Sequence, residues 1–303
     1  MDIVEIRDVT KTFNEHTAVD DITLSVPKGS IYGFIGPNGS GKTTTIRMIM
    51  GIFYPDRGSI NVFGKSLRGA RNERIGYLPE ERGLYRKMKV RDVLRFYGGL
   101  KAGQSVNKEV DFWLEKLDLM QWADAKVEAL SKGMSQKVQF ISTVVAKPEL
   151  VILDEPFTGL DPVNLDVIRE AVLELNAGGT TVIFSTHDMN VAETMCDFIF
   201  MIYKGKKVLD GTLKSIQGSY GHDTLRVICE DGPKVLENLP GVDRIRDFGK
   251  LQELRITDDV DPQQIVATLM SRTRVRSFEI ARPSLHNIFV RIANPEAEEV
   301  DHA

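Results

Sequence analysis

A glycine-rich stretch near the start of the chain reads Gly36-Pro37-Asn38-Gly39-Ser40-Gly41-Lys42-Thr43-Thr44. It fits the phosphate-binding pattern G-x-x-x-x-G-K-[ST] at every fixed position. Backbone N–H groups must converge on phosphate in such a loop, and side chains at Gly39 and Gly41 would obstruct them. Lys42 would reach the β- and γ-phosphates, and Thr43 would reach Mg²⁺. The stretch therefore predicts a site for a nucleoside triphosphate.

The segments on either side of this loop support the prediction. Residues 30–35 form a short apolar run that is typical of a buried strand, and residues 44–50 are predicted to form a helix that Gly51 can end. A strand, a glycine loop and a helix thus follow one another in the order that phosphate binding needs. A glycine-rich turn without a ligand is the alternative, and it does not explain why all fixed positions match.

Length and composition narrow the class of protein. The chain has 303 residues, which favours two domains, and its net charge of −4 argues against broad nucleic-acid binding. Cys196 and Cys229 show neither a disulfide framework nor metal-ligand spacing. We find no apolar run of about 18 residues and no secretion signal. We therefore expect a chain without a membrane span of its own, in a reducing cytoplasm.

Two acids follow a second apolar run, more than a hundred residues beyond the glycine loop. Residues 150–153 are predicted to form a buried strand, and Asp154 and Glu155 come directly after it. In phosphoryl transfer to water, one carboxylate at a strand end holds the metal and a second group orients the attacking water. Asp154 suits the first role and Glu155 the second. A strand that merely ends in a polar turn is the alternative, which the upstream glycine loop disfavours.

A histidine follows a third apolar run. Residues 180–185 are predicted to form a strand, and His187 comes two residues after it. Ligands of open α/β sheets bind at the carboxyl ends of the strands. An isolated histidine there is usually a surface residue, so the role of His187 depends on the glycine loop and the acids that accompany it.

Further motifs lie before the glycine loop, between this loop and the two acids, and between the acids and the histidine. They are Phe13, Gly76-Tyr77-Leu78-Pro79-Glu80, Leu130-Ser131-Lys132-Gly133-Met134-Ser135-Gln136 and Gly159-Leu160-Asp161. In this order, the motifs of residues 2–218 resemble those of the ATP-binding subunits of ABC transporters. The resemblance implies that Phe13 stacks on adenine, that residues 76–80 link the nucleotide site to a membrane partner, and that residues 130–136 are the signature segment. It further implies that residues 159–161 are the D-loop and that His187 is the switch histidine.

The motifs and the resemblance together give a set of site residues. The predicted catalytic residues are Glu155, His187 and Lys42, and the predicted metal ligands are Thr43, Glu80 and Asp154. The predicted nucleotide-binding residues are Phe13, Gly36, Asn38, Gly39, Ser40, Gly41, Lys42, Thr43, Thr44, Ser131, Gly133 and Asp161. Ser131 precedes a helical run over residues 136–145, so its hydroxyl and the helix N-terminus can meet a phosphate. In the family, that phosphate belongs to ATP on another subunit.

The resemblance also implies an architecture and a function. We expect an α/β fold, with a P-loop NTPase core of ABC type over residues 1–218 and a helical subdomain at about 81–148. The cofactors would be ATP and Mg²⁺, and the partners a transmembrane permease subunit and a second ATPase subunit, identical or related, with no nucleic acid. Such a subunit hydrolyses ATP, sits at the cytoplasmic face of the membrane and drives transport, here expected to be export.

Two departures from the family pattern keep other functions open. Glu80 stands where most members carry glutamine, and Lys132-Gly133-Met134 replaces the usual Gly-Gly-Gln. Glu80 adds negative charge beside the triphosphate, and Lys132 adds positive charge that partly offsets it. A nucleotide sensor with weak hydrolysis is therefore one alternative. A soluble ABC-type ATPase acting on nucleic acid or ribosomes is another, disfavoured because the chain has no sustained heptads and only one ATPase unit.

The composition changes to linker residues near 217–222, and a different pattern follows. We expect strands over 224–229, 242–246, 251–256 and 275–280, and helices over 232–239, 262–270 and 283–290. The order βαββαβ predicts a small α+β ferredoxin-like domain over residues 219–295, with a frayed tail over 296–303. It resembles the extra domain that follows the ATPase in some ABC exporters, including those likened to sodium-efflux ATPases. We expect an accessory role, as a dimer-contact or regulatory module, with a small-molecule sensor as the alternative.

Overall fold

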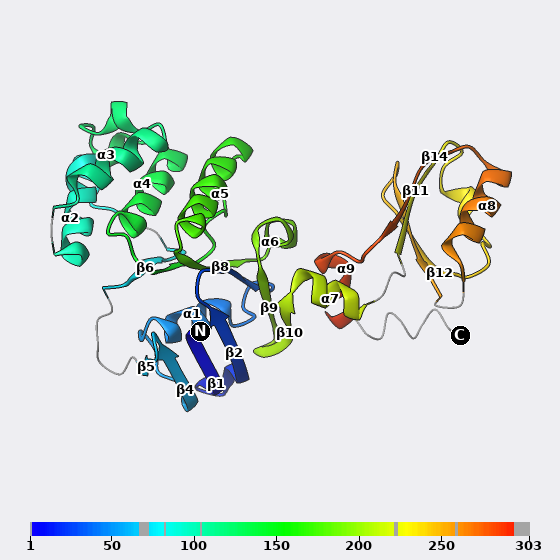
Figure 1. Ribbon diagram of the computed structural model, residues 1–303, viewed down its shortest axis with the longest axis horizontal. Helices are drawn as coiled ribbons and strands as arrows, with labels where there is room; N and C mark the ends of the chain where they lie inside the picture. Colours follow the sequence, from blue (N-terminus) through cyan, green and yellow to red (C-terminus); the bar gives the residue numbers. More distant parts are fainter. Residues whose placement is uncertain are drawn as a thin grey trace. The chain divides into compact units, whose positions relative to one another are not determined.

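The computed structural model describes residues 2–66, 73–81, 83–103, 105–220, 224–257 and 260–293. The chain divides into two compact units, Met1–Thr212 and Leu213–Ala303 (Figure 1). The predicted boundary between residues 218 and 219 falls before the last residue of the helix α7 (Leu213–Ser219). The predicted tail over 296–303 lies outside the described residues. The limits of the two domains stay predictions.

The first unit is built on a six-stranded sheet in the order β10-β9-β3-β8-β7-β6. The strands are β3 (Ile31–Ile35), β6 (Ile75–Leu78), β7 (Leu150–Leu153), β8 (Thr181–Thr186), β9 (Phe198–Tyr203) and β10 (Lys206–Thr212). All neighbouring pairs are parallel except β9 and β10. Every residue of β3, β7 and β8 is buried, which explains their continuous apolar runs. These three neighbouring strands carry the glycine loop, the two acids and the histidine at one edge, as predicted.

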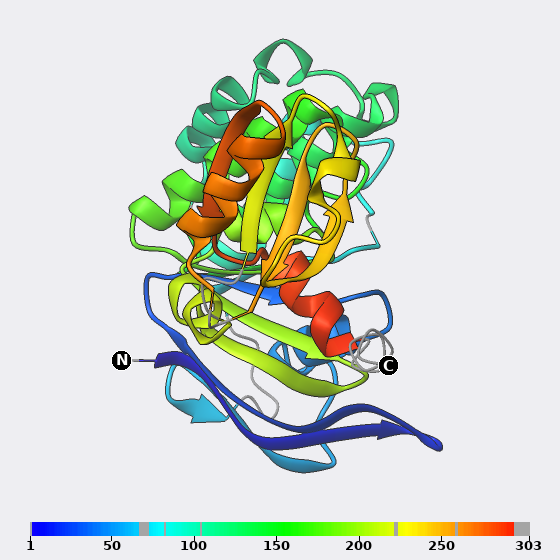
Figure 2. The same cartoon turned by 90° about the vertical axis from the view of Figure 1, so that its right-hand side faces the viewer.

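A second, antiparallel sheet belongs to the same unit and was not predicted. Its order is β2-β1-β4-β5, formed by β1 (Asp2–Phe13), β2 (His16–Pro27), β4 (Arg57–Val62) and β5 (Lys65–Ser66). Figure 2 shows the long β1–β2 hairpin in dark blue. Its buried side chains, such as Val4 and Ile22, share one core with Phe34 of β3 and Ile46 of α1 (Lys42–Ile49). The hairpin thus fixes the strand and the helix that flank the glycine loop.

Helices fill the chain between β6 and β7, as expected for the helical subdomain. They are α2 (Val90–Ala102), α3 (Asn107–Lys116) and α4 (Lys132–Val144), with the short 3₁₀ turns η1 (Met120–Trp122) and η2 (Val127–Ala129). Val93, Val110, Leu114 and Val138 are buried in a core that also receives side chains of β7 and β8. Two more helices, α5 (Pro162–Ala177) and α6 (Met189–Met195), follow β7 and β8. The α/β core of P-loop type with a helical subdomain is therefore confirmed.

The second unit has the predicted ferredoxin-like arrangement. Its sheet has the order β12-β13-β11-β14, from β11 (Thr224–Cys229), β12 (Val242–Asp247), β13 (Gln252–Ile256) and β14 (Val275–Ala281). The helix α8 (Pro262–Arg272) packs on this sheet through Ile265 and Leu269. The predicted helix over 232–239 is only a 3₁₀ turn, η3 (Pro233–Leu236), and the last helix is α9 (Leu285–Ala293). Pro240 and Gly241 come directly after the predicted range 232–239, and neither residue favours a longer helix there.

Candidate active site

The glycine loop joins β3 to α1 in a conformation that requires glycine at two positions. Gly36 and Gly41 have φ of 154° and 115°. A Cβ on Gly36 would lie 2.2 Å from the carbonyl oxygen of Ile202, and one on Gly41 would lie 2.5 Å from that of Ala18. Backbone therefore surrounds the loop on one side and leaves no room for side chains there. This is the cradle that a phosphate chain needs.

Lys42 begins α1, and its side chain folds back over the loop. Its ammonium donates hydrogen bonds to the carbonyl oxygens of Gly36, at 2.7 Å, and Pro37, at 3.2 Å. It also lies 3.5 Å from Oε1 of Glu155. The side chain is only 5% exposed, so this cation acts where solvent screens it little. Lys42 thus links the glycine loop to the end of β7.

Asp154 follows β7 and is completely buried. Its Oδ1 accepts hydrogen bonds from the hydroxyls of Ser185, at 2.6 Å, and Thr43, at 3.2 Å. Its Oδ2 has no hydrogen-bond partner within the described part of the chain. Burial raises the pKa of Asp154. A buried carboxylate oxygen without a donor is costly unless it meets a cation, so Asp154 and Thr43 fit a Mg²⁺ site.

Glu155 is held on several sides. Its backbone has φ of 50°, which is strained for a residue other than glycine, and its N–H donates to the hydroxyl of Ser185 at 2.9 Å. The carboxylate oxygen Oε2 accepts from the hydroxyl of Thr158 at 2.9 Å and lies 3.1 Å from Nδ1 of His187. The side chain of Glu155 is 6% exposed, whereas that of His187 is 51% exposed. A fixed, buried carboxylate thus lies between Lys42 and His187.

Two residues of this cluster were missed from the sequence. Ser185 joins the side chain of Asp154 to the backbone of Glu155, and Thr158 donates to the Glu155 carboxylate. A signal existed for Ser185, because it is a polar residue at the carboxyl end of an otherwise apolar run. Thr158 has no such signal, since hydroxyl residues are common in turns.

The signature segment and the D-loop lie beside each other, and Nε2 of Gln136 in the signature segment donates to the carbonyl oxygen of Thr158 at 3.2 Å. Ser131 caps α4, with its hydroxyl accepting from the N–H of Met134 at 3.2 Å. Asp161 caps α5 by accepting from the N–H of Asn164 at 3.0 Å, which lowers the pKa of Asp161. A Cβ on Gly133 would lie 2.8 Å from Nδ2 of Asn164.

The remaining predicted residues lie around the loop. Phe13 is 38% exposed at the end of β1 and packs edge-on against Phe53, with ring centroids 5.3 Å apart. Glu80 is exposed just beyond β6. Burial first, and then the charge of Asp154 with a smaller contribution from Glu80, raises the pKa of Tyr77. In the loop itself, Asn38 and Gly39 are exposed, Ser40 is buried and Thr44 is half-buried. The roles of all these residues stay predictions.

Known proteins resemble both units of the chain. Residues 19–158 match the family model described as ABC transporter, and residues 211–293 match that of the ATP-binding protein DrrA1-3-like, C-terminal domain. YhaQ of Bacillus subtilis, named an uncharacterized ABC transporter ATP-binding protein, is 42% identical over 95% of this chain and 97% of its own length. Nod factor export ATP-binding protein I of Ralstonia nicotianae is 34% identical, over 97% and 94%.

The solved structures lead to the same family. The structure of the ATP binding subunit of an ABC transporter matches with a TM-score of 0.68 and 31% identity, over 72% of this chain and 93% of that one. Over the residues that the structure describes, no helix has both the length and the apolar character needed to span a bilayer. The glycine cradle, the buried acids and these similarities agree. The chain belongs to the ATP-binding proteins of ABC transporters, and it is an ATPase whose hydrolysis of ATP is coupled to transport.

Proposed function

We propose that this chain works at the cytoplasmic face of a membrane, where it hydrolyses ATP as part of a dimer and drives export through a separate transmembrane subunit. Export is supported by the relative named for Nod factor export, which matches this chain over nearly its whole length. The observation that carries the catalytic part of the proposal is the position of Glu155, buried between Lys42 and His187.

Glu155 is the proposed general base. Its carboxylate is fixed by Thr158 and lies beside Lys42 on one side and His187 on the other, so it can hold an attacking water in one orientation. Lys42 contributes positive charge next to the loop that would bind the phosphates. His187 is half-exposed and contacts Glu155 through Nδ1, so it is placed to stabilise the charge that develops in the reaction.

Asp154 and Thr43 are the proposed ligands of Mg²⁺. They are joined to each other through Oδ1 of Asp154, and its Oδ2 is the buried oxygen without a donor. When bound, Mg²⁺ would neutralise charge on the phosphate oxygens. Glu80 is exposed just beyond β6, and we propose it as a third group that acts on the metal, either directly or through its water.

The dimer is proposed from the residues that remain outside the catalytic cluster. Ser131 is exposed at the N-terminus of α4, where N–H groups and the helix dipole favour an anion. Gly133 packs closely against Asn164, and Asp161 lies at the start of the neighbouring helix α5. We propose that this surface contacts ATP held by the glycine loop of a second ATPase subunit, identical or related to this chain.

ATP turnover by the purified chain tests the proposal. We expect Glu155→Gln to lower the turnover number by roughly 10²–10⁴-fold, the usual contribution of a general base. The same variant should form a dimer in size-exclusion chromatography only when ATP is present, because it binds ATP without consuming it. Glu170→Gln, an exposed glutamate of α5, is the matched control and should keep wild-type turnover.

Two results would contradict the proposal. Equal turnover of Glu155→Gln and Glu170→Gln would remove Glu155 from the reaction. Wild-type protein that binds ATP but neither turns it over nor dimerises, alone or with its transmembrane subunit, would instead indicate the nucleotide sensor that Glu80 and Lys132 keep as an alternative.

A further inference from the structure

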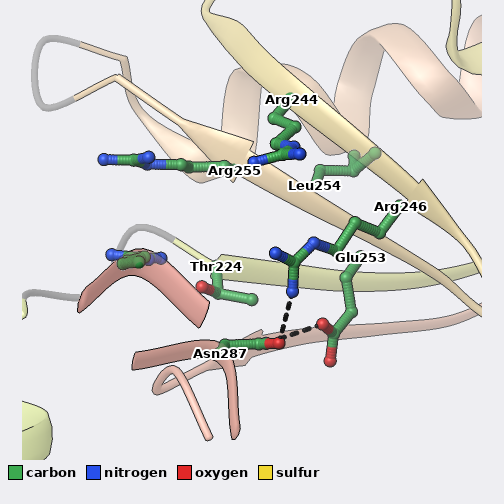
Figure 3. A pocket seen from close by; sticks show the side chains of 8 residues that line it. Thr224, Arg244, Arg246, Glu253, Leu254, Arg255 and Asn287 are labelled. Carbon is green, nitrogen blue, oxygen red and sulfur yellow. Dashed lines mark hydrogen bonds between the residues drawn. The ribbon is translucent and has the colours of Figure 1, made fainter. Parts of the chain in front are cut away.

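A small cavity lies within the second unit, on the face of its sheet that is turned away from α8. Strand β12 contributes Arg244 and Arg246, and strand β13 contributes Glu253 and Arg255. Helix α9 contributes Asn287, which Figure 3 shows. It also contributes Arg291, one helical turn further along α9. The cavity measures about 30 Å³, which is enough for one small chemical group. It is separate from the glycine loop, which lies in the first unit.

The side chains that line this cavity concentrate positive charge. Four of them are guanidinium groups and one is a carboxylate. Arg244 stands directly opposite Arg255 in the β12–β13 pair, and like charges at opposed positions destabilise a sheet. Burial, together with the charges of Arg244, Arg291 and Arg255, lowers the pKa of Arg246. Asp243 lies 3.7 Å from Nε of Arg255 and offsets part of this charge, but the lining itself has an excess of positive charge.

The carboxylate of Glu253 is already engaged by neighbouring donors. Its Oε2 accepts from Nδ2 of Asn287 at 2.8 Å, and its Oε1 accepts from Nε of Arg226 at 2.9 Å. Oδ1 of Asn287 in turn accepts from Nη1 of Arg246 at 2.6 Å. Figure 3 shows the two hydrogen bonds of Asn287. Asn287 and Glu253 are each less than a tenth exposed, so these hydrogen bonds belong to the interior of the unit and fix the guanidinium of Arg246.

We propose that this cavity binds a phosphate group. Phosphate monoesters and inorganic phosphate carry close to two negative charges at neutral pH. A ligand of this charge suits a lining with several arginines better than a ligand with a single carboxylate does. The planar fork of a guanidinium matches phosphate oxygens in a bidentate fashion. Inorganic phosphate, a soluble phosphomonoester and the headgroup of phosphatidic acid all offer this chemistry. The site adds ligand binding in the second unit to the ATPase activity of the first.

Calorimetric titration of the full chain with inorganic phosphate tests the proposal. The chain would carry Lys42→Ala throughout, so that phosphate binds less tightly at the glycine loop and a second site can be measured separately. We expect Arg246→Ala and Arg244→Gln each to weaken phosphate binding roughly tenfold to hundredfold, the range for hydrogen bonds to charged groups. Arg276→Ala is the matched control, because Arg276 is an exposed arginine of β14 that pairs with Glu230 outside the cavity.

Two further measurements keep the test decisive. The unfolding midpoint of each variant shows whether it is folded, and Arg244→Gln is informative even if Arg246→Ala unfolds. Titration with glycerol 3-phosphate, and sedimentation with phosphatidylcholine vesicles with and without phosphatidic acid, separate a soluble ligand from a lipid headgroup. Arg246-dependent binding to either supports the site. Equal phosphate affinity of the cavity variants and Arg276→Ala, or acetate binding as tight as phosphate, overturns it.

Discussion

At the scale of single residues, the nucleotide site holds a carboxylate that is unfavourable for the ligand-free fold. Asp154 is completely buried, its Oδ2 lacks a donor within the described chain, and burial raises its pKa above the ordinary value of 3.8. The unfolded chain therefore loses this proton at lower pH than the folded chain does. As pH rises through that interval, ionisation of Asp154 favours unfolding, so this residue lowers stability at neutral pH.

We expect Asp154→Asn to raise the thermal unfolding midpoint of the nucleotide-free protein at pH 7.5. The amide keeps an oxygen for Ser185 and Thr43 and carries no charge. The gain should shrink as the pH falls towards 3.8 and vanish below it, where the wild-type carboxyl is protonated in both states, and Mg²⁺-dependent ATP turnover should fall. Asp124→Asn is the control, because Asp124 is exposed and its ion pair with Lys89, at 3.7 Å, lies at the surface. A gain that does not depend on pH would contradict the role of ionisation.

Ser185 connects the two acids, and its loss should affect both. Ser185→Ala leaves the N–H of Glu155 without its acceptor and removes one of two donors to Asp154. We expect it to lower the free energy of unfolding by about 1–3 kcal/mol, the usual effect of a buried group left without its partner. ATP turnover should fall as well, because Glu155 is then less firmly placed. Urea unfolding and turnover assays measure both effects.

Ser219→Ala is the comparison for that variant. Ser219 is exposed and only donates to a carbonyl within α7, so its loss should change stability by less than about 0.5 kcal/mol. Equal stability of the two variants would mean that the Ser185 bridge contributes nothing measurable.

At the scale of elements, the glycine loop contains two kinds of glycine. Gly41 has positive φ and is enclosed by the backbone of Ala18, whereas Gly39 has positive φ but open space around its Cα. We expect Gly41→Ala to abolish ATP binding or destabilise the fold, because the backbone contact at 2.5 Å must be relieved by moving β2 or the loop. Gly39→Ala should cost only the left-handed conformation, about 1–2 kcal/mol. Nucleotide-binding titrations and unfolding curves compare the two, and equal defects would contradict the packing argument.

The β12–β13 pair should become more stable when its like charges are separated. Arg244→Thr removes the charge opposite Arg255 and places a residue that favours strands. We expect the second unit to gain roughly 0.2–1 kcal/mol, the size of a cross-strand pair effect. Arg276→Thr, which instead breaks a surface pair with Glu230, should give no gain. Unfolding followed by a probe in the second unit measures the difference, and a loss of stability in Arg244→Thr would show that the arginines support the fold.

Which elements the sequence could predict depends on how they are buried. The strands β3, β7 and β8 are buried on both faces, so their apolar runs are visible, and motifs at their ends mark the site. Strands β1 and β2 are buried on one face and interrupted by bulges, so their alternation is broken and we did not predict them. The role of Ser185 arises only where the ends of β7 and β8 meet, whereas Thr158 was missed because it contacts Glu155 within one turn that looks ordinary in the sequence.

At the scale of the whole molecule, each unit carries a hydrophobic core of its own. The nucleotide site lies entirely within Met1–Thr212, whereas Leu213–Ala303 has a separate core around Leu225, Leu254 and Leu269. A ligand stabilises only the cooperative unit that binds it. The two units should therefore respond to different ligands, even though they share one chain.

We expect calorimetric unfolding of the full chain to show two transitions, of which a non-hydrolysable ATP analogue raises only one. At a hundredfold excess over its dissociation constant, a ligand stabilises by about 2.7 kcal/mol, or roughly 5–10 °C for a unit of this size. Inorganic phosphate added to Lys42→Ala protein should move the other transition, because the arginine cavity lies in the second unit. A single transition that moves as a whole with either ligand would mean that the two units unfold together and that their separate cores do not make them independent.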